Sequence, residues 1–183
     1  NNTLKGTGAD TVWNLTGDNS GIVNGLIFSN IDDLEGSADF NDTFSVENKV
    51  KWSGTIDGGA GTGTNTLNLT SVTENVIFSI EQSGTISVNT APDTWSSLGI
   101  IPEEVLSLLS DGLGIDDVQN VSSLIGGSAD NTFAFKDLAS FAGTIDGGSG
   151  VTNTLDYSAY TGNVTVDFNV VPATGMATAT GTT

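Results

Sequence analysis

A long internal repeat constrains the fold of this chain more than any other feature, because a duplicated pattern has to form two copies of one structural unit. Residues 30–80 recur as residues 120–168, and the clearest matches are 89 positions apart. They pair Phe44, Trp52, Gly54, Thr55, Ile56, Asp57, Gly58, Gly59 and Gly61 with Phe133, Phe141, Gly143, Thr144, Ile145, Asp146, Gly147, Gly148 and Gly150, respectively. We therefore predict two stacked copies of a turn-and-strand unit whose matching apolar residues share one interior.

A shorter motif recurs along the chain, in which Asp or Asn is followed by Thr and then by a large apolar residue. It occurs at Asp10-Thr11-Val12, Asp42-Thr43-Phe44, Asn65-Thr66-Leu67, Asn131-Thr132-Phe133 and Asn153-Thr154-Leu155. Nearby glycines permit a tight turn, the Asx side chain bonds to the turn backbone, and Thr with an apolar residue starts an alternating strand. The motif therefore predicts a turn followed directly by a strand.

Alternation of apolar and polar residues predicts many short strands separated by turns. The predicted strands are residues 11–15, 26–30, 43–47, 50–52, 66–70, 76–81, 85–89, 132–136, 154–158 and 164–170. A β-sandwich needs hairpin turns between most strands, whereas only Asn24-Gly25 and the Asp-Gly pairs supply that signal. Glycine at equivalent places favours instead an all-β fold, a right-handed parallel β-solenoid of the β-helix or β-roll kind.

One segment departs from this pattern and predicts a short helical insertion near Pro102 to Gly112. Pro102, Glu103 and Glu104 are typical of a helix start, and Gly112 of a helix end. The buried stripe of this helix would be Val105, Leu106, Leu109 and Leu113. We expect the helix to cover an edge of the solenoid, or to dock a partner if Trp95, Leu98 and Ile100 are exposed.

The repeat and the insertion divide the chain into three predicted parts. Residues 1–81 form the first solenoid repeat unit, residues 82–117 the insertion with its short helix, and residues 118–183 the second solenoid repeat unit. The pattern is interrupted near Gly6 and again near Thr183, which predicts that flanking repeats continue the stack. Exposed ends of the stack would offer unpaired strand edges to identical copies.

The charge balance excludes several classes of partner and of site. The chain has 22 Asp and Glu residues against 4 Lys, no Arg, and a formal net charge of -18. Nucleic acid is therefore a poor partner, and bound cations with oxygen ligands are favoured. His and Cys are absent, which excludes thiolate and imidazole zinc sites and His-based catalytic triads. Because no apolar run reaches the roughly 18 residues of a membrane span, we predict no membrane insertion.

The segment Gly6-Thr7-Gly8-Ala9-Asp10-Thr11-Val12 resembles the calcium-binding nonapeptide of the repeats-in-toxin family, with Lys5 in place of its first glycine. Weaker matches begin at Gly58 and Gly147, but they reach only Asn65 and Asn153 after inserted residues. The resemblance implies a parallel β-roll in which glycine carbonyls and an aspartate of adjacent turns hold calcium. The chain is also similar to repeat regions of large bacterial surface adhesins and of some S-layer proteins.

The predicted cofactor is therefore calcium (Ca2+), held by oxygen atoms beside the glycine-rich turns. The candidate metal ligands are Gly6, Gly8, Asp10, Asp39, Asp42, Asp57, Asp130 and Asp146. A calcium ion takes about six to eight oxygen ligands, so one isolated motif does not complete a site. The alternative is that these aspartates are ordinary turn residues on a solvated face.

Catalysis is not expected. We interpret Asp32-Asp33 and Asp116-Asp117 as connecting segments ahead of strands, and adjacent residues of a strand face opposite sides, so they make poor carboxylate dyads. Lys49, Lys51 and Lys136 alternate along strands in the manner of edge charges. The sequence contains no nucleophile motif, and we predict that the chain is not an enzyme.

The sequence predicts a non-catalytic structural repeat segment of a secreted bacterial surface or matrix protein, of the adhesin or filament type. We expect it to be stabilised by calcium, to lie outside the cell or on the bacterial cell surface, and to associate with neighbouring repeats or identical subunits. Surface glycans are a further possible partner. The alternatives are an S-layer subunit and a carbohydrate-binding module, whose stacking platforms would be Trp13, Trp52, Trp95, Tyr157 and Tyr160.

Overall fold

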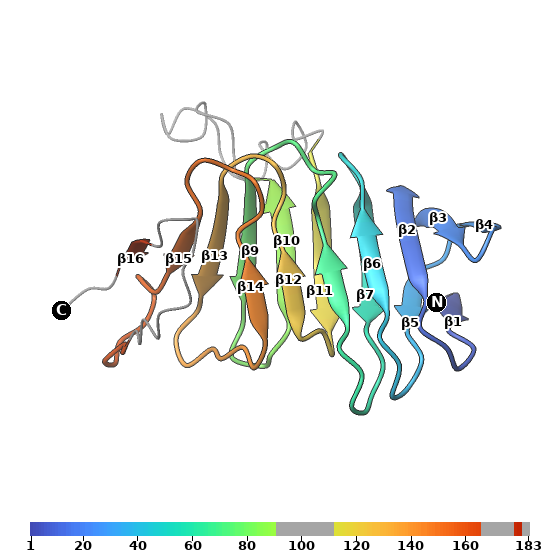
Figure 1. Cartoon of the computed structure of the whole chain (residues 1–183), viewed down its shortest axis with the longest axis horizontal. Helices are drawn as coiled ribbons and strands as arrows, with labels where there is room; N and C mark the ends of the chain where they lie inside the picture. Colours follow the sequence, from blue (N-terminus) through green and yellow to red (C-terminus); the bar gives the residue numbers. More distant parts are fainter. Residues whose placement is uncertain (91–111, 166–177, 181–183) are drawn as a thin grey trace.

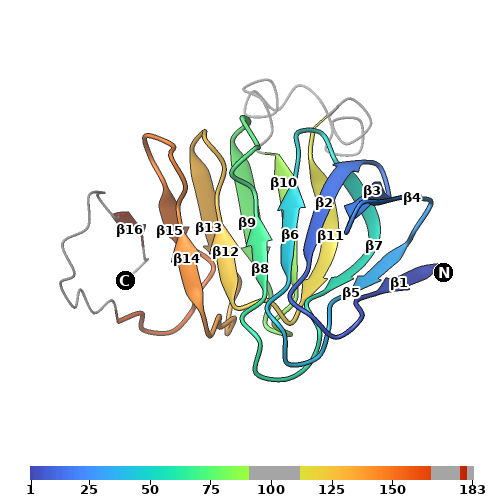
Figure 2. The same ribbon diagram turned by 45° about the vertical axis from the view of Figure 1, so that its right-hand side comes forward.

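The computed structural model describes residues 1–90 and 112–165 and the backbone of residues 178–180. The described residues form strands and turns, without a helix, in two sheets that lie face to face (Figures 1 and 2). Successive strands of both sheets follow one another along the longest axis of the molecule (Figure 1). The predicted all-β class is therefore confirmed.

The larger sheet has nine strands in the order β1-β5-β7-β11-β10-β9-β13-β15-β16. Its strands are β1 (Thr3–Lys5), β5 (Asp33–Glu35), β7 (Lys51–Asp57), β9 (Val76–Ile80), β10 (Ile86–Thr90), β11 (Gly114–Gln119), β13 (Asn131–Phe135), β15 (Thr154–Asp156) and β16 (Thr178–Thr180). The smaller sheet has seven strands in the order β14-β12-β8-β6-β2-β3-β4. Its strands are β2 (Val12–Gly17), β3 (Ser20–Val23), β4 (Leu26–Ser29), β6 (Thr43–Val46), β8 (Thr66–Asn68), β12 (Ser123–Ile125) and β14 (Thr144–Asp146).

The predicted parallel β-solenoid is wrong, because both sheets mix parallel and antiparallel pairs. Antiparallel pairing joins β2 to β3, β3 to β4, β9 to β10 and β10 to β11. The β3–β4 hairpin turns at Asn24-Gly25, where both residues have positive φ, of 50° and 78°. Two such residues form the tight turn that matches the twist of an antiparallel pair. This local signal is present in the sequence, ahead of the first copy of the repeat.

The predicted helix at residues 102–112 lies outside the described residues, except for Gly112. The described ends of the predicted insertion are strands, because β10 and the first residues of β11 belong to the nine-stranded sheet. Asp33 and the pair Asp116-Asp117 are likewise in strands β5 and β11, and not in connecting segments as predicted. In the described part of the chain, no helix is long and apolar enough to cross a membrane.

Strands that begin with the Asx-Thr-apolar motif lie parallel and in register, as two separate stacks. In the seven-stranded sheet, Trp13 of β2 pairs with Phe44 of β6, and Phe44 pairs with Leu67 of β8. In the nine-stranded sheet, Phe133 of β13 pairs with Leu155 of β15. In β6, β8, β13 and β15 the large apolar residue of the motif therefore lies next to its equivalent in the adjacent strand and faces the space between the sheets. In β2 the motif's Val12 is instead 52% exposed, and Trp13, one residue later, faces the core.

Matching residues of the two copies of the long repeat lie in opposite sheets. Phe44 lies in the seven-stranded sheet and its match Phe133 in the nine-stranded one. Conversely, Ile56 lies in the nine-stranded sheet and its match Ile145 in the seven-stranded one. The chain alternates between sheets in each copy, but β9, β10 and β11 follow one another in the same sheet and reverse the alternation. The copies therefore share one interior, as predicted, but do not stack their matching residues on each other.

Aromatic rings fill that interior and close one end of it. Trp13 stacks on Phe44 with ring centroids 5.8 Å apart, and Phe78 stacks on Phe133 at 4.5 Å. Phe28 of β4 lies edge-on to Trp13 of one sheet and to Trp52 of the other. The β3–β4 hairpin therefore closes the core at the end of the molecule where β1 and the N-terminus lie (Figure 1).

Close backbone approach at Gly36 gives a test of this packing. A Cβ atom at Gly36 would lie 2.3 Å from the Gly58 carbonyl oxygen and 2.7 Å from Asp42 Oδ2. We expect Gly36→Ala to lower the free energy of unfolding by about 1–3 kcal/mol, because neither of these two atoms is at the end of a flexible side chain that could move away. Urea unfolding measures the change. The matched control is Gly162→Ala, where a Cβ meets no atom within 4 Å; equal effects of the two substitutions would contradict the packing.

Candidate metal centre

The structure places the eight predicted calcium ligands in separate turns and does not gather them. Gly6, Gly8 and Asp10 lie between β1 and β2, and Asp39 and Asp42 between β5 and β6. The others lie at turns of different strands, namely Asp57 at the end of β7, Asp130 before β13 and Asp146 at the end of β14. Within residues 1–90 and 112–165, no group of three or more acidic side chains is placed to hold a metal ion.

Three of these aspartates bond to the backbone of a neighbouring turn. Asp10 Oδ1 accepts a hydrogen bond from the Asn41 backbone N–H at 2.9 Å. Asp39 Oδ1 accepts from the Thr62 N–H at 3.0 Å, and Asp130 Oδ1 from the Thr152 N–H at 2.8 Å. Each carboxylate thus supplies an acceptor to a loop N–H that no strand pairs, which stabilises the stack of turns.

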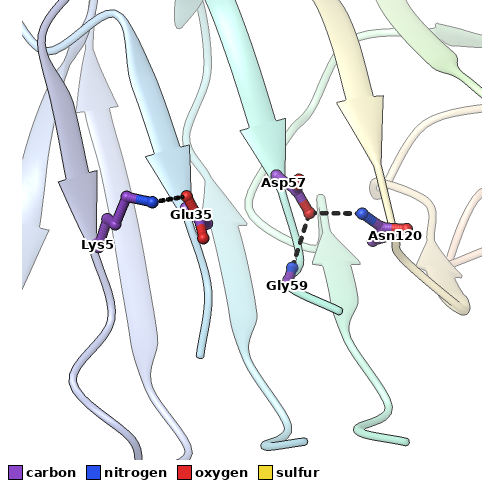
Figure 3. A network of polar contacts seen from close by, with 5 residues as sticks. All are labelled: Lys5, Glu35, Asp57, Gly59 and Asn120. Atoms are coloured by element: carbon purple, nitrogen blue, oxygen red, sulfur yellow. Dashed lines mark hydrogen bonds and ion pairs between the residues drawn. The ribbon is translucent and has the colours of Figure 1, made fainter. Parts of the chain in front are cut away.

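Asp57 and Asp146, which match each other in the long repeat, bond within their own turns. Asp57 Oδ1 accepts from the Gly59 N–H at 2.8 Å, and Asp146 Oδ1 accepts from the Gly148 N–H at 2.9 Å. Figure 3 shows that the Asn120 amide also donates to Asp57 Oδ1, at 2.8 Å. The same view contains the ion pair of Lys5 with Glu35 on the adjacent parallel strands β1 and β5. The bonds of Asp57 and Asp146 to the backbone N–H two residues later are those of Asx turns, the alternative interpretation of the aspartates.

The two predicted glycine ligands pack against the loop after β5. The Gly6 N–H donates to the Glu35 carbonyl oxygen at 2.8 Å, and the Gly8 N–H donates to Ser37 Oγ at 3.0 Å. A Cβ at Gly6 would lie 2.4 Å from Ser37 Oγ, whereas Gly8 has a φ of +80° and open space around it. Close approach therefore explains Gly6, and the left-handed backbone conformation explains Gly8.

Asp42 differs from the other aspartates because it is completely buried and incompletely bonded. Its Oδ2 accepts from the Ser37 N–H at 2.7 Å, and its own N–H donates to Asn65 Oδ1 at 2.9 Å. Its Oδ1 has no hydrogen-bond partner, a state shared in the described residues with Trp13 Nε1. An unpaired buried polar atom costs about 1–3 kcal/mol of stability.

The second copy of the repeat shows which group fits this position. Asn131, the match of Asp42, is also buried, and its N–H donates to Asn153 Oδ1 at 3.0 Å as the Asp42 N–H does to Asn65. The Asn131 side-chain amide donates to the carbonyl oxygens of Ala129 at 2.6 Å and Gly147 at 2.9 Å. A carboxylate cannot donate to such carbonyl groups, because it only accepts hydrogen bonds. Where Asn131 has an NH2 group with two protons, Asp42 has a second oxygen that can only accept hydrogen bonds.

These geometries do not fit one shared calcium site built from the eight predicted ligands. One open carboxylate oxygen, at Asp42, falls well short of the six to eight oxygens that calcium takes. Calcium binding itself stays a prediction. The sequence pattern missed the buried asparagines Asn65 and Asn131 and the half-buried Asn153 as hydrogen-bonding residues of the turns, although the Asx-Thr-apolar motif already marked each of them.

The aromatic residues predicted as sugar-stacking platforms do not form an exposed row in the described part of the chain. Trp13 and Trp52 are each only 1% exposed, and both belong to the core. Tyr157 and Tyr160 are half-buried, and Tyr157 stacks on Phe135 with centroids 4.5 Å apart. Trp95 lies outside the described residues.

Two carboxylates of the acidic pairs Asp32-Asp33 and Asp116-Asp117 share one threonine as a hydrogen-bond partner. Thr55 lies between two of these carboxylates, because its N–H donates to Asp33 Oδ1 and its hydroxyl to Asp117 Oδ2, both at 3.0 Å. The three residues come from the adjacent strands β5, β7 and β11. Their hydrogen bonds tie the outer surface of the sheet together.

Comparison of the chain with protein-family models, with curated proteins and with solved structures finds no match. The resemblance to the repeats-in-toxin family therefore still depends on the residues of the sequence alone, chiefly residues 6–12.

Replacement of the Asp42 carboxylate by an amide tests the unpaired oxygen. We expect Asp42→Asn to raise the free energy of unfolding by about 1–3 kcal/mol, because the amide restores the donor that Asn131 provides in the other copy. The converse change Asn131→Asp should lower it by a similar amount. Urea unfolding of both variants in a chelator measures the two changes, and a destabilised Asp42→Asn would contradict this account.

Comparison of the unmodified chain with Asp42→Asn tests calcium at this position. If Asp42 is a calcium ligand, calcium raises the melting temperature of the unmodified chain, and Asp42→Asn loses that increase. Thermal melts followed by circular dichroism, with calcium and with chelator, give the answer. If the unmodified chain melts at the same temperature with calcium and with chelator, calcium does not stabilise this protein.

The Tyr157 phenol gives a prediction for alkaline pH. Burial raises the pKa of Tyr157, and the neighbouring Tyr160 raises it further. The unfolded chain then ionises first, near pH 10, so the stability that Tyr157 contributes is complete below that pH and is lost as the pH rises through its folded pKa. We expect Tyr157→Phe to lose less stability than the unmodified chain between about pH 9 and pH 11. Urea unfolding across this range measures the two slopes, and equal slopes would refute the prediction.

Proposed function

We propose that this chain is a non-catalytic structural segment of a secreted bacterial surface or matrix protein, of the adhesin or filament type. The observation that carries the proposal is the use of the carboxylates. Asp10, Asp39 and Asp130 each bond to the backbone of a neighbouring turn, so these polar groups hold the fold together instead of facing a substrate. A location outside the cell rests on the motif at residues 6–12.

Self-association is the second part of the proposal, and the strand order supports it. Both sheets end in strands with one unpaired edge within the described residues, namely β1 and β4 at one end and β14 at the other. Such edges offer backbone N–H and C=O groups to a further strand. The elongated arrangement of the sheets (Figure 1) suits a spacer that joins others of its kind end to end.

The large negative charge sets the conditions under which copies can meet. Each copy carries a formal charge of -18, so two copies repel each other at low ionic strength. Salt or divalent cations such as calcium reduce this repulsion without a dedicated site. Stabilisation by calcium therefore stays in the proposal as a property of the whole surface.

A carbohydrate-binding module is less well supported, because Trp13 and Trp52 are enclosed by the core. An S-layer subunit is a special case of the proposed function, in which the copies form a two-dimensional lattice.

Sedimentation velocity across a wide range of protein and salt concentrations tests the proposal. We expect the weight-average mass to rise with protein concentration and to rise further with salt, because salt screens the charge on each copy. Circular dichroism at the same concentrations shows that the associating species is folded. A strict monomer under every condition would overturn the self-associating role.

A further inference from the structure

The β3–β4 hairpin carries exposed apolar side chains on a segment without charge. Ile22 is 37%, Leu26 58% and Ile27 78% exposed, and Val12 on the neighbouring strand β2 is 52% exposed. Val12, Ile22 and Ile27 lie on the outer face, and we call these three residues the hairpin patch. Leu26 lies on the opposite face of the hairpin, the face of Phe28. Residues 19–31 contain no charged residue, although the chain as a whole has a formal charge of -18.

The inner side of the hairpin packs against the core, so the hairpin patch is part of a fixed surface and not of a loose loop. Phe28 is buried and lies edge-on to Trp13 and Trp52, with centroids 6.5 Å and 6.3 Å away. Because successive side chains of a strand face opposite sides, Ile27 points away from the core. Ile22 pairs with Ile27 across the hairpin and lies on the same outer side. An end cap is expected to have a polar outer face, and this one is apolar.

The backbone of β4 is open along the same side of the hairpin. β4 is the last strand of its sheet, and in the described residues it pairs only with β3. In a hairpin with a two-residue turn, the residues next to the turn exchange hydrogen bonds with each other, and pairs then alternate. Leu26 and Phe28 therefore bond toward β3, whereas Ile27 and Ser29 direct their N–H and C=O groups to the free edge.

Charge identifies the partner that this edge fits. A basic partner would be drawn to the acidic turns, where the carboxylates lie. A partner with the same large negative charge is repelled there and meets least repulsion at the uncharged hairpin. A second copy of this chain is such a partner, and an antiparallel strand pair is compatible with a twofold axis, so the same patch can serve both copies.

We propose that the β3–β4 hairpin is the interface between two copies of this chain, which pair their β4 strands antiparallel across a twofold axis. This inference rests on the self-association in the proposed function and specifies its geometry. A twofold contact closes on itself. This end of the molecule therefore forms pairs, and any longer assembly uses the opposite end.

A lysine in the patch tests the interface. We expect sedimentation velocity to show a dimer for the unmodified chain, and Ile27→Lys to weaken dimerisation at least tenfold, because an edge lysine discourages strand pairing. The matched control is Val151→Lys, since Val151 is 97% exposed and the charge change is the same. It should dimerise as the unmodified chain does, and circular dichroism checks that both variants are folded.

A single cysteine locates the contact directly, because the chain contains no cysteine of its own. Ile27→Cys should give covalent dimers with a short bismaleimide, and Val151→Cys should give none. If association persists in Ile27→Lys and Ile27→Cys does not cross-link, the hairpin interface is refuted while the proposed self-association stands. If the unmodified chain is a monomer throughout, both are refuted.

Discussion

Stacking of large apolar side chains between parallel neighbours is the interaction on which the rest of this structure depends. Several strands, such as β5, β8 and β12, have only three residues, and strands of that length are not stable alone. Each contributes one fully buried residue, and these residues align in register with equivalents on the next strand, as Leu34 does with Ile56. The core is therefore assembled from many small contributions that depend on one another.

The turns make this assembly possible for so acidic a chain. Carboxylates and asparagine side chains accept hydrogen bonds from loop N–H groups, as at Asp39 with Thr62 and at Asn153 with Asn131. A buried or half-buried loop is then not left with unpaired backbone groups. As a result, each turn depends on its neighbour for its hydrogen bonds. At Asp42, a carboxylate occupies a site that suits an amide, and its Oδ1 is left without a hydrogen-bond partner.

The sequence predicted the strands that follow the Asx-Thr-apolar motif, because there a turn signal and an alternating pattern coincide. Strands β6, β8, β13 and β15 were found in this way. Strands β5, β12 and β14 were missed, since a strand of three residues is too short to show alternation. The mixed sheets were missed because the repeat was given more weight than the Asn24-Gly25 turn, and because the turn at Gly84 between β9 and β10 was not counted as a hairpin signal. At the candidate site, the motif identified Asp42 as a turn residue, but only its burial separates it from Asp10, which the sequence treated alike.

The exchange of the two repeat copies between sheets has a consequence for the outside of the molecule. Phe44 and Phe133 both point inward, so the threonines next to them, Thr43 and Thr132, point outward from opposite sheets. The outer surface of each sheet therefore carries its own version of the motif, and the duplication has not extended a single surface. A partner that recognises the outer surface of one sheet therefore meets a related surface on the other sheet.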